Sequence, residues 1–221
     1  MNSPAPTEPF AILRQRMVES QLGARGIGDE RVLQAMLRVP RHEFTPEPYR
    51  SQAYQDHPLP IGEGQTISQP YIVASMLEAL ELTPADKVLE VGTGSGYVTA
   101  LLAELTARVI SIERHAALAE QASGLLSRLA YTNVQVVVGD GSRGFPAEAP
   151  YNAIIVSAAA AELPTSLLVQ LCEGGRMIVP VGPTESQRLQ LIHMKNGQPE
   201  IILREPCRFV PLVSGQKDGM L

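Results

Sequence analysis

The residues best suited to chemistry form a glycine-rich segment near the middle of the chain. Gly92, Gly94 and Gly96 alternate directly after a short apolar run, and a helical pattern begins at Tyr97. Glycines at the end of a strand let the backbone come close to a ligand, and the free N–H groups of a following helix favour polar or anionic groups. We therefore predict a nucleotide-like cofactor at this turn, with a simple tight turn as the alternative.

Two later segments place polar residues where strands are expected to end. Glu113 suits the hydroxyl groups of a ribose, and Asp140, followed by Gly141, suits an exocyclic adenine amine. Either segment alone could be an exposed strand end or a turn, but three consecutive strand ends of this kind favour one shared ligand edge. NAD is disfavoured because Tyr97 stands where the dinucleotide fingerprint requires its third glycine.

The elements that must position these residues alternate between strand and helix from residue 87 onward. Strands are predicted over residues 87–91, 108–113, 134–139, 153–156 and 176–181, and helices over residues 97–104, 116–129 and 163–171. Such repeats predict an α/β fold with a doubly wound, mostly parallel, Rossmann-like sheet. Residues 189–194 and 201–210 are predicted as strands joined by a turn at 195–198, so the sheet is expected to end with antiparallel strands.

The residues before this sheet are predicted to form helices and a loop rather than alternating strands and helices. Helices are predicted over residues 10–22, 29–38 and 70–82, with Asp29 as a cap and Pro70 in a first turn. Residues 57–68 are expected to form a long apolar loop, a kind of segment that often carries function. The 221 residues predict one compact domain with an N-terminal helical and substrate-loop subregion (1–82) and a cofactor-binding core (83–221).

Composition argues against several classes of protein. A net charge of -5 without any run of Lys or Arg disfavours a nucleic-acid partner. The longest apolar run, residues 153–161, falls far short of the ~20 residues of a membrane span. Cys172 and Cys207 match neither a metal-ligand spacing nor a disulfide framework. Residues 1–10 lack the pattern of a signal peptide, so a cytoplasmic protein without metal or membrane is expected.

Two segments resemble a known family. Residues 88–96 resemble the glycine-rich first motif of class I S-adenosylmethionine-dependent methyltransferases, and residues 62–70, Gly-Glu-Gly-Gln-Thr-Ile-Ser-Gln-Pro, resemble the signature of protein-L-isoaspartate O-methyltransferases. The resemblance extends over roughly residues 17–213, with supporting blocks at 39–44, 111–114, 139–141 and 208–212. Val98, Asn152 and Cys207 depart from the family pattern, and none is expected to touch the matched motifs.

The resemblance implies a protein-repair enzyme. It would transfer a methyl group from S-adenosylmethionine to the free α-carboxylate of an L-isoaspartyl residue in a damaged protein or peptide, giving an ester that leads to succinimide and aspartate. Ser68 would be the catalytic residue, lying beside the methyl donor and binding the acceptor carboxylate. The other residues that the resemblance implies are Glu90, Gly92, Thr93, Gly94 and Gly96 at the methionine portion, Glu113 at the ribose, Asp140 and Gly141 at the adenine, and Thr66, Ile67, Val210 and Pro211 with Ser68 at the substrate.

The chemistry of this acceptor requires little of the protein. A carboxylate with a reference pKa near ~3.5 to 4 is already ionised at pH 7, so no general base is needed. This agrees with the four scattered histidines, none of which is expected to be catalytic. In isolation, Ser68 would more often be a helix cap. Residues 58–65 and 209–212 are expected to wall the peptide groove, with ordinary core packing as the alternative.

Other functions remain open at this stage. A methyltransferase acting on a different carboxylate, a small molecule or RNA would keep the glycine loop but need another acceptor region. A non-catalytic adaptor would keep the cofactor pocket and recruit another protein. The expected partners are isoaspartyl proteins and peptides, and a monomer is favoured.

Overall fold

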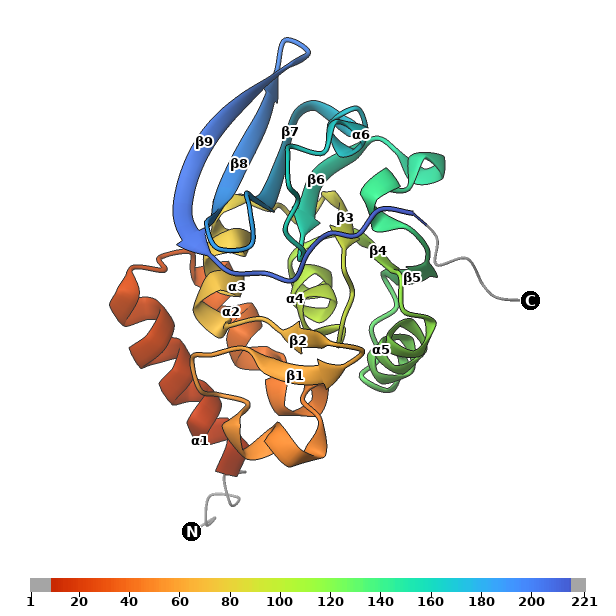
Figure 1. The fold of residues 1–221 in the computed structure, drawn as a ribbon. Helices are drawn as coiled ribbons and strands as arrows, with labels where there is room; N and C mark the ends of the chain where they lie inside the picture. The colour runs from red at the N-terminus through yellow and green to blue at the C-terminus, as the bar shows by residue number, and fades with distance from the viewer. Residues whose placement is uncertain (1–8, 216–221) are drawn as a thin grey trace, which may run out of the picture.

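The centre of the molecule is a seven-stranded sheet in the order β5-β4-β3-β6-β7-β8-β9, seen in the computed structural model of residues 9–215 (Figure 1). Its parallel part comprises β3 (Lys87–Val91), β4 (Arg108–Glu113), β5 (Val134–Val138), β6 (Tyr151–Val156) and β7 (Leu171–Val181). β8 (Gln187–Lys195) and β9 (Gln198–Cys207) are added antiparallel. The predicted sheet and its closing hairpin are therefore confirmed. Residues 1–8, which hold most of the segment examined for a signal peptide, lie outside the described residues.

The order of the strands creates a switch point beside β3. From β3 the chain moves outward to β4 and β5, and it then returns to β6 on the other side of β3. The connections therefore diverge at the carboxyl end of β3, which is where parallel sheets bind ligands. β3 and β4 agree with the prediction residue for residue because their apolar side chains are buried on both faces of the sheet.

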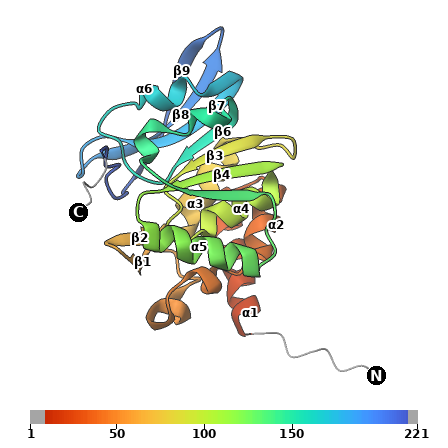
Figure 2. The same cartoon turned by 90° about the vertical axis from the view of Figure 1, so that its right-hand side faces the viewer.

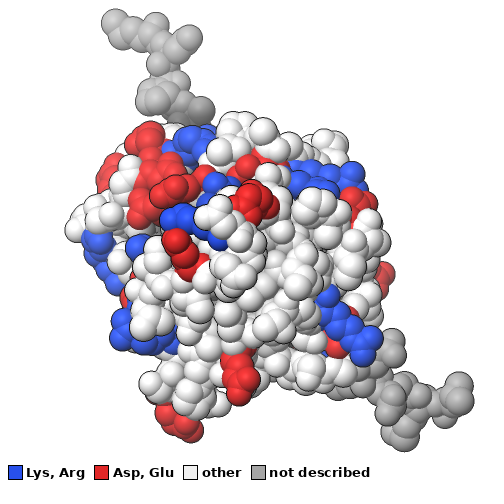
Figure 3. Space-filling view, turned by 90° about the horizontal axis from the view of Figure 1, so that it is seen from above, with Lys and Arg blue, Asp and Glu red and all other residues white. Residues whose placement is uncertain are grey.

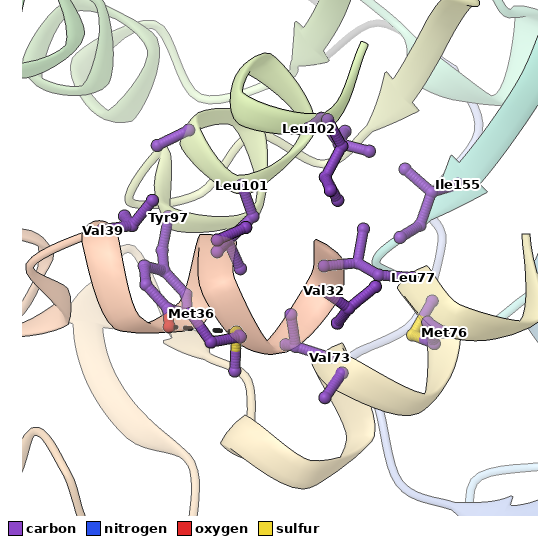
Figure 4. Packing of buried hydrophobic residues seen from close by; sticks show 14 of the residues in the cluster. Val32, Met36, Val39, Val73, Met76, Leu77, Tyr97, Leu101, Leu102 and Ile155 are labelled. Carbon is purple, nitrogen blue, oxygen red and sulfur yellow. Dashed lines mark hydrogen bonds between the residues drawn. The ribbon is translucent and has the colours of Figure 1, made fainter. Parts of the chain in front are cut away.

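Helices cover one face of the sheet, and shorter segments cover the other. The helices are α1 (Pro9–Arg16), which continues as a π-helix (Met17–Leu22), α2 (Glu30–Arg38), α3 (Pro70–Ala79), α4 (Tyr97–Leu105), α5 (Ala116–Arg128) and the short α6 (Thr165–Leu168). Side chains from the π-helix to α5 share one buried cluster with β3, β4, β6, β7 and β8. Figure 2 shows these helices on one side of the sheet, and Figure 4 shows part of the cluster in detail. A second cluster on the opposite face joins the sheet to α6. The N-terminal residues thus pack onto the sheet through a continuous core.

The termini of two N-terminal helices follow the predicted signals. The Asp29 carboxylate caps α2 by accepting hydrogen bonds from the N–H groups of Arg31 at 2.8 Å and Val32 at 3.3 Å. Pro70 occupies the first turn of α3, where its missing N–H costs nothing. Among residues 9–215, no helix combines the length and apolar character needed to cross a membrane.

Three local predictions are wrong. Residues 57–68 do not form an irregular loop, because β1 (Leu59–Gly62) and β2 (Gln65–Ile67) pair as an antiparallel hairpin. The helix expected over 163–171 is only α6, since the Gln170 carbonyl accepts from Tyr151 N–H at 2.8 Å and turns the chain into β7. β9 ends at Cys207 rather than at residue 210.

Candidate active site

A cavity of about 320 Å³ lies at the carboxyl ends of the central parallel strands. Its volume is in the range of small-molecule sites. Six parts of the chain meet there. They are residues 65–68 from β2 and the segment after it, the β3–α4 loop with the start of α4, residues 112–115 at the end of β4, Gly141, residues 157–158 after β6, and the C-terminal residues 210–213.

Most of the residues assigned from the sequence line this one cavity. They are Thr66, Ile67, Ser68, Gly92, Thr93, Gly94, Glu113, Gly141, Val210 and Pro211. Glu90, Gly96 and Asp140 are not among the lining residues. The structure thus brings the two predicted motifs together and leaves these three residues outside the lining of the cavity.

Close packing explains two of the glycines. Gly96 has a φ of 87°, and a Cβ atom there would lie 3.2 Å from Ala122 Cβ of α5, so this glycine lets α4 pack against α5. Gly141 has no room for a side chain because its Cβ would lie 2.6 Å from Val91 Cγ1. A side chain at position 141 would therefore collide with Val91, which also lines the cavity.

Glu113 connects two loops of the cavity. The residue is 5% exposed. One carboxylate oxygen accepts from Gly94 N–H at 2.9 Å and the other accepts from His115 N–H at 2.9 Å. Each oxygen keeps a further lone pair, so the carboxylate is held in place and can still accept from a ligand hydroxyl.

Glu90 lies inside the protein rather than at the cavity. Its Oε2 accepts from Thr99 Oγ1 at 2.5 Å and from Ser111 Oγ at 2.7 Å, while the buried Oε1 has no partner. Complete burial raises the pKa of Glu90 to about 8, against the lowering effect of the two hydroxyl donors. Ser111 Oγ also lies 2.5 Å from Thr93 Oγ1. This network braces β3 beneath the glycine loop.

Asp140 ties the C-terminal segment to the edge of the sheet. Its carboxylate accepts from Ser142 N–H at 3.0 Å, from Ser142 Oγ at 2.7 Å and from Gly215 N–H at 2.9 Å. Burial alone would raise the pKa of Asp140, but these donors and Arg143 outweigh it and hold the pKa below its usual value. Figure 1 shows the C-terminal segment crossing from β9 toward β5.

Ser68 lines the cavity between β2 and α3. It does not cap α3, whose N-cap residue is Gln69. The first turn of α3 is instead bound by Asp56, which accepts from Tyr71 N–H at 3.1 Å. Within the described residues, the Ser68 hydroxyl makes no hydrogen bond to the protein. It is therefore available to a ligand.

Of the two segments predicted to wall the peptide groove, residues 209–212 largely line the cavity and residues 58–65 largely do not. Val210 and Pro211 are fixed beside the cavity because Ala159 N–H donates to the Val210 carbonyl at 2.8 Å. Of the predicted wall at 58–65, only Gln65 lines the cavity.

Of the three departures from the family pattern, one reaches the cavity. Val98 lines it directly, so the expectation that it lies apart from the cofactor motifs is wrong. Asn152 instead accepts from Lys87 N–H at 2.9 Å, and Cys207 ends β9. Neither is among the residues that line the cavity.

Tyr97 and Ser157 also line the cavity, and the sequence reasoning did not assign them to the site. The signal that could have found Ser157 is its place directly after β6, at the same edge of the sheet as the glycine loop. Among residues 9–215, no cluster of three or more His, Cys, Asp or Glu side chains is arranged to hold a metal ion.

Comparisons with known proteins agree with this geometry. Residues 13–217 match a family described as protein-L-isoaspartate(D-aspartate) O-methyltransferase. Proteins named protein-L-isoaspartate O-methyltransferase from Koribacter versatilis and Methanoculleus marisnigri are 54% and 56% identical to this chain. The first alignment covers 94% of this chain and 93% of that protein, and the second covers 93% and 94%.

Two solved structures have the same fold. One, named protein-L-isoaspartate O-methyltransferase, is 32% identical with a TM-score of 0.82 and covers 91% of this chain and 66% of that chain. A second, from Plasmodium falciparum, carries the same family name and contains S-adenosyl-L-homocysteine. It is 30% identical with a TM-score of 0.80, over 90% of this chain and 98% of that chain.

Proposed function

Because the chain belongs to the protein-L-isoaspartate(D-aspartate) O-methyltransferase family, we propose that Ser68 and the cavity it lines carry out this family's methyl transfer. The enzyme transfers a methyl group from S-adenosylmethionine to the free α-carboxylate of L-isoaspartyl residues in damaged proteins and peptides. The product ester leads to succinimide and then to aspartate.

One observation carries the proposal. Ser68, from the hairpin side, and Glu113, from the sheet side, line the same cavity together with the glycine loop. The segment expected to bind the acceptor and the segments expected to bind the methyl donor therefore meet in one place, although they are far apart in the sequence. A cofactor pocket without an acceptor site would not require this meeting.

The cavity suits S-adenosylmethionine. Glu113 offers two fixed acceptor oxygens for the ribose hydroxyls, and Gly141 lines the part of the cavity where the adenine would bind. Gly92, Thr93 and Gly94 would bind the methionine portion. When bound, the cofactor supplies an electrophilic methyl group on a positively charged sulfur. In this arrangement Glu90 and Gly96 support the loop from behind.

The protein's residues then act by positioning. The acceptor carboxylate is ionised at neutral pH, so no side chain has to remove a proton from it. The Ser68 hydroxyl donates to one carboxylate oxygen and leaves the other free to attack the methyl carbon. Thr66, Ile67, Val210 and Pro211 surround the acceptor and exclude water, which strengthens the attraction between the two opposite charges.

Replacement of Ser68 tests this assignment. We expect Ser68→Ala to lower turnover on an isoaspartyl peptide and to leave the affinity for S-adenosyl-L-homocysteine nearly unchanged. Ser68→Thr, which keeps a hydroxyl, is the matched control and should retain more activity than Ser68→Ala. Unchanged turnover in Ser68→Ala would remove the assignment.

The proposal extends to the partners, the compartment and the oligomeric state of the protein. Isoaspartyl proteins and peptides are the proposed partners. The face in Figure 3 carries interspersed acidic and basic side chains, which supports the expectation of no nucleic-acid partner. We also propose a cytoplasmic monomer whose subregions divide near residues 82 and 83.

A further inference from the structure

The side chain of Arg41 is completely buried between the N-terminal helices and the cavity wall. It belongs to a short 3-10 helix, Arg41–Phe44. Its Nε donates to the carbonyl of Ala53 at 2.7 Å, and its Nη2 donates to the carbonyl of Ser68 at 2.8 Å. The chain between these two carbonyls contains the β1–β2 hairpin. One guanidinium group therefore joins the two ends of the segment that carries Ser68.

The charge of Arg41 is not matched by an acidic side chain. None of the ion pairs among the described residues includes Arg41, and its buried Nη1 has no hydrogen-bond partner. Asp56, whose charge also acts on Arg41, forms an ion pair with Arg25. Burial lowers the pKa of Arg41 to about 10, so the side chain stays charged at neutral pH.

Arg41 also contacts the wall of the cavity. Its guanidinium carbon lies 4.9 Å from the centre of the Tyr97 ring, a cation–π distance, and Tyr97 lines the cavity. The Tyr97 hydroxyl donates to Met36 Sδ at 3.4 Å, as Figure 4 shows. The Tyr97 side chain is thus held through both its hydroxyl group and its ring face.

A buried cation without a counter-ion costs free energy. The acceptor of the proposed reaction is an anion that arrives next to Ser68. We propose that Arg41 is a positioning residue for methyl transfer, which holds Ser68 through its carbonyl group and places an unmatched positive charge behind the acceptor carboxylate. This inference rests on the proposed role of Ser68.

The two contributions of Arg41 affect different kinetic constants. The carboxylate loses its charge as the methyl group is transferred, so the field of Arg41 stabilises the bound acceptor more than the transition state and mainly lowers KM. The hydrogen bond to Ser68 fixes the attacking geometry and mainly raises kcat. A lysine keeps the charge but cannot bridge two carbonyls as a planar guanidinium does.

Arg41→Lys and Arg41→Met separate the two contributions. We expect Arg41→Lys to lower kcat on an isoaspartyl peptide by about tenfold with little change in KM, and Arg41→Met also to raise KM by about tenfold. In a Ser68→Ala background, Arg41→Lys should lower kcat by less than twofold, because its effect acts through Ser68. Equal losses of kcat in both backgrounds would overturn the proposal. A wild-type enzyme inactive on isoaspartyl peptides would instead contradict the proposed function.

A measurement on the unaltered chain covers the case in which these variants fail to fold. In the enzyme labelled with nitrogen-15 and saturated with S-adenosyl-L-homocysteine, the Nε–H signal of Arg41 should be protected from exchange by its bond to Ala53. Adding an isoaspartyl peptide should shift this signal, whereas the matched aspartyl peptide should leave it in place. No shift with a saturating isoaspartyl peptide would overturn the proposal.

Discussion

Replacing Glu113 tests how the cavity holds the cofactor. Both carboxylate oxygens accept a backbone N–H at 2.9 Å, from Gly94 and His115, and the side chain is almost fully buried. Glu113→Gln keeps the shape but has one acceptor oxygen, so its NH₂ group must face one of the two donors. Glu113→Ala removes both acceptors and also the proposed contact with the ribose.

The expected magnitude follows from these bonds. A hydrogen bond to a charged group contributes about 1.5–3 kcal/mol, and part of this loss is recovered when water enters the cavity. We therefore expect Glu113→Ala to weaken cofactor binding by ~1–3 kcal/mol, which corresponds to roughly 5- to 150-fold in Kd. Glu113→Gln should lie between this variant and the wild type.

Calorimetric titration with S-adenosyl-L-homocysteine measures these affinities, and thermal unfolding of the same samples measures stability. Glu63→Gln is the matched control. Like Glu113, Glu63 contacts His115, with its carboxylate 3.4 Å from His115 Nδ1, but it does not line the cavity. It should bind the cofactor within about twofold of wild type. If Glu113→Ala loses stability but binds with wild-type affinity, then Glu113 only braces the loops and the ribose role is wrong.

Two further predictions concern Gly141 and Glu90. Gly141→Ala should weaken or abolish cofactor binding in the same titration, since its Cβ would lie 2.6 Å from Val91. Gly139→Ala is the control and should bind the cofactor normally, because the nearest contact of its Cβ is at 3.6 Å. Equal affinities of the two variants would refute the steric argument. Burial raises the pKa of Glu90 to about 8 from an ordinary 4.5. Between these pH values the folded protein holds a proton that the unfolded chain releases, so the stability of the wild type should fall as the pH rises from 4.5 to 8. Glu90→Gln removes this titration and should unfold at a more constant temperature over that range; parallel pH profiles would contradict the raised pKa.

The strands of the sheet could be predicted because their signals are local. β3 and β4 are rich in Val, Leu and Ile, with a single polar residue inside each, and such composition suits buried parallel strands. The β1–β2 hairpin was missed because Pro60, Gly62 and Gly64 argue against strands. It forms because Leu59 and Ile67 are buried in the core, which is a tertiary effect.

In the site, too, residues with local sequence signals could be predicted, and residues that depend on tertiary contacts could not. The glycine loop and Glu113 could be placed from the sequence because the loop directly follows β3 and Glu113 is the last residue of β4. The position of Glu90 required the register of β3 against β4, which sets Glu90 opposite Ser111. Arg41 lies 27 residues before Ser68, and no pattern along the chain indicates that their groups meet.

Transfer of labelled methyl from S-adenosylmethionine to matched peptides tests the central claim most directly. The two peptides should differ only in having an isoaspartyl or an aspartyl residue at one position. The account predicts label on the isoaspartyl peptide alone, and release of that label as the ester converts to succinimide. Label on neither peptide, or equally on both, would contradict it.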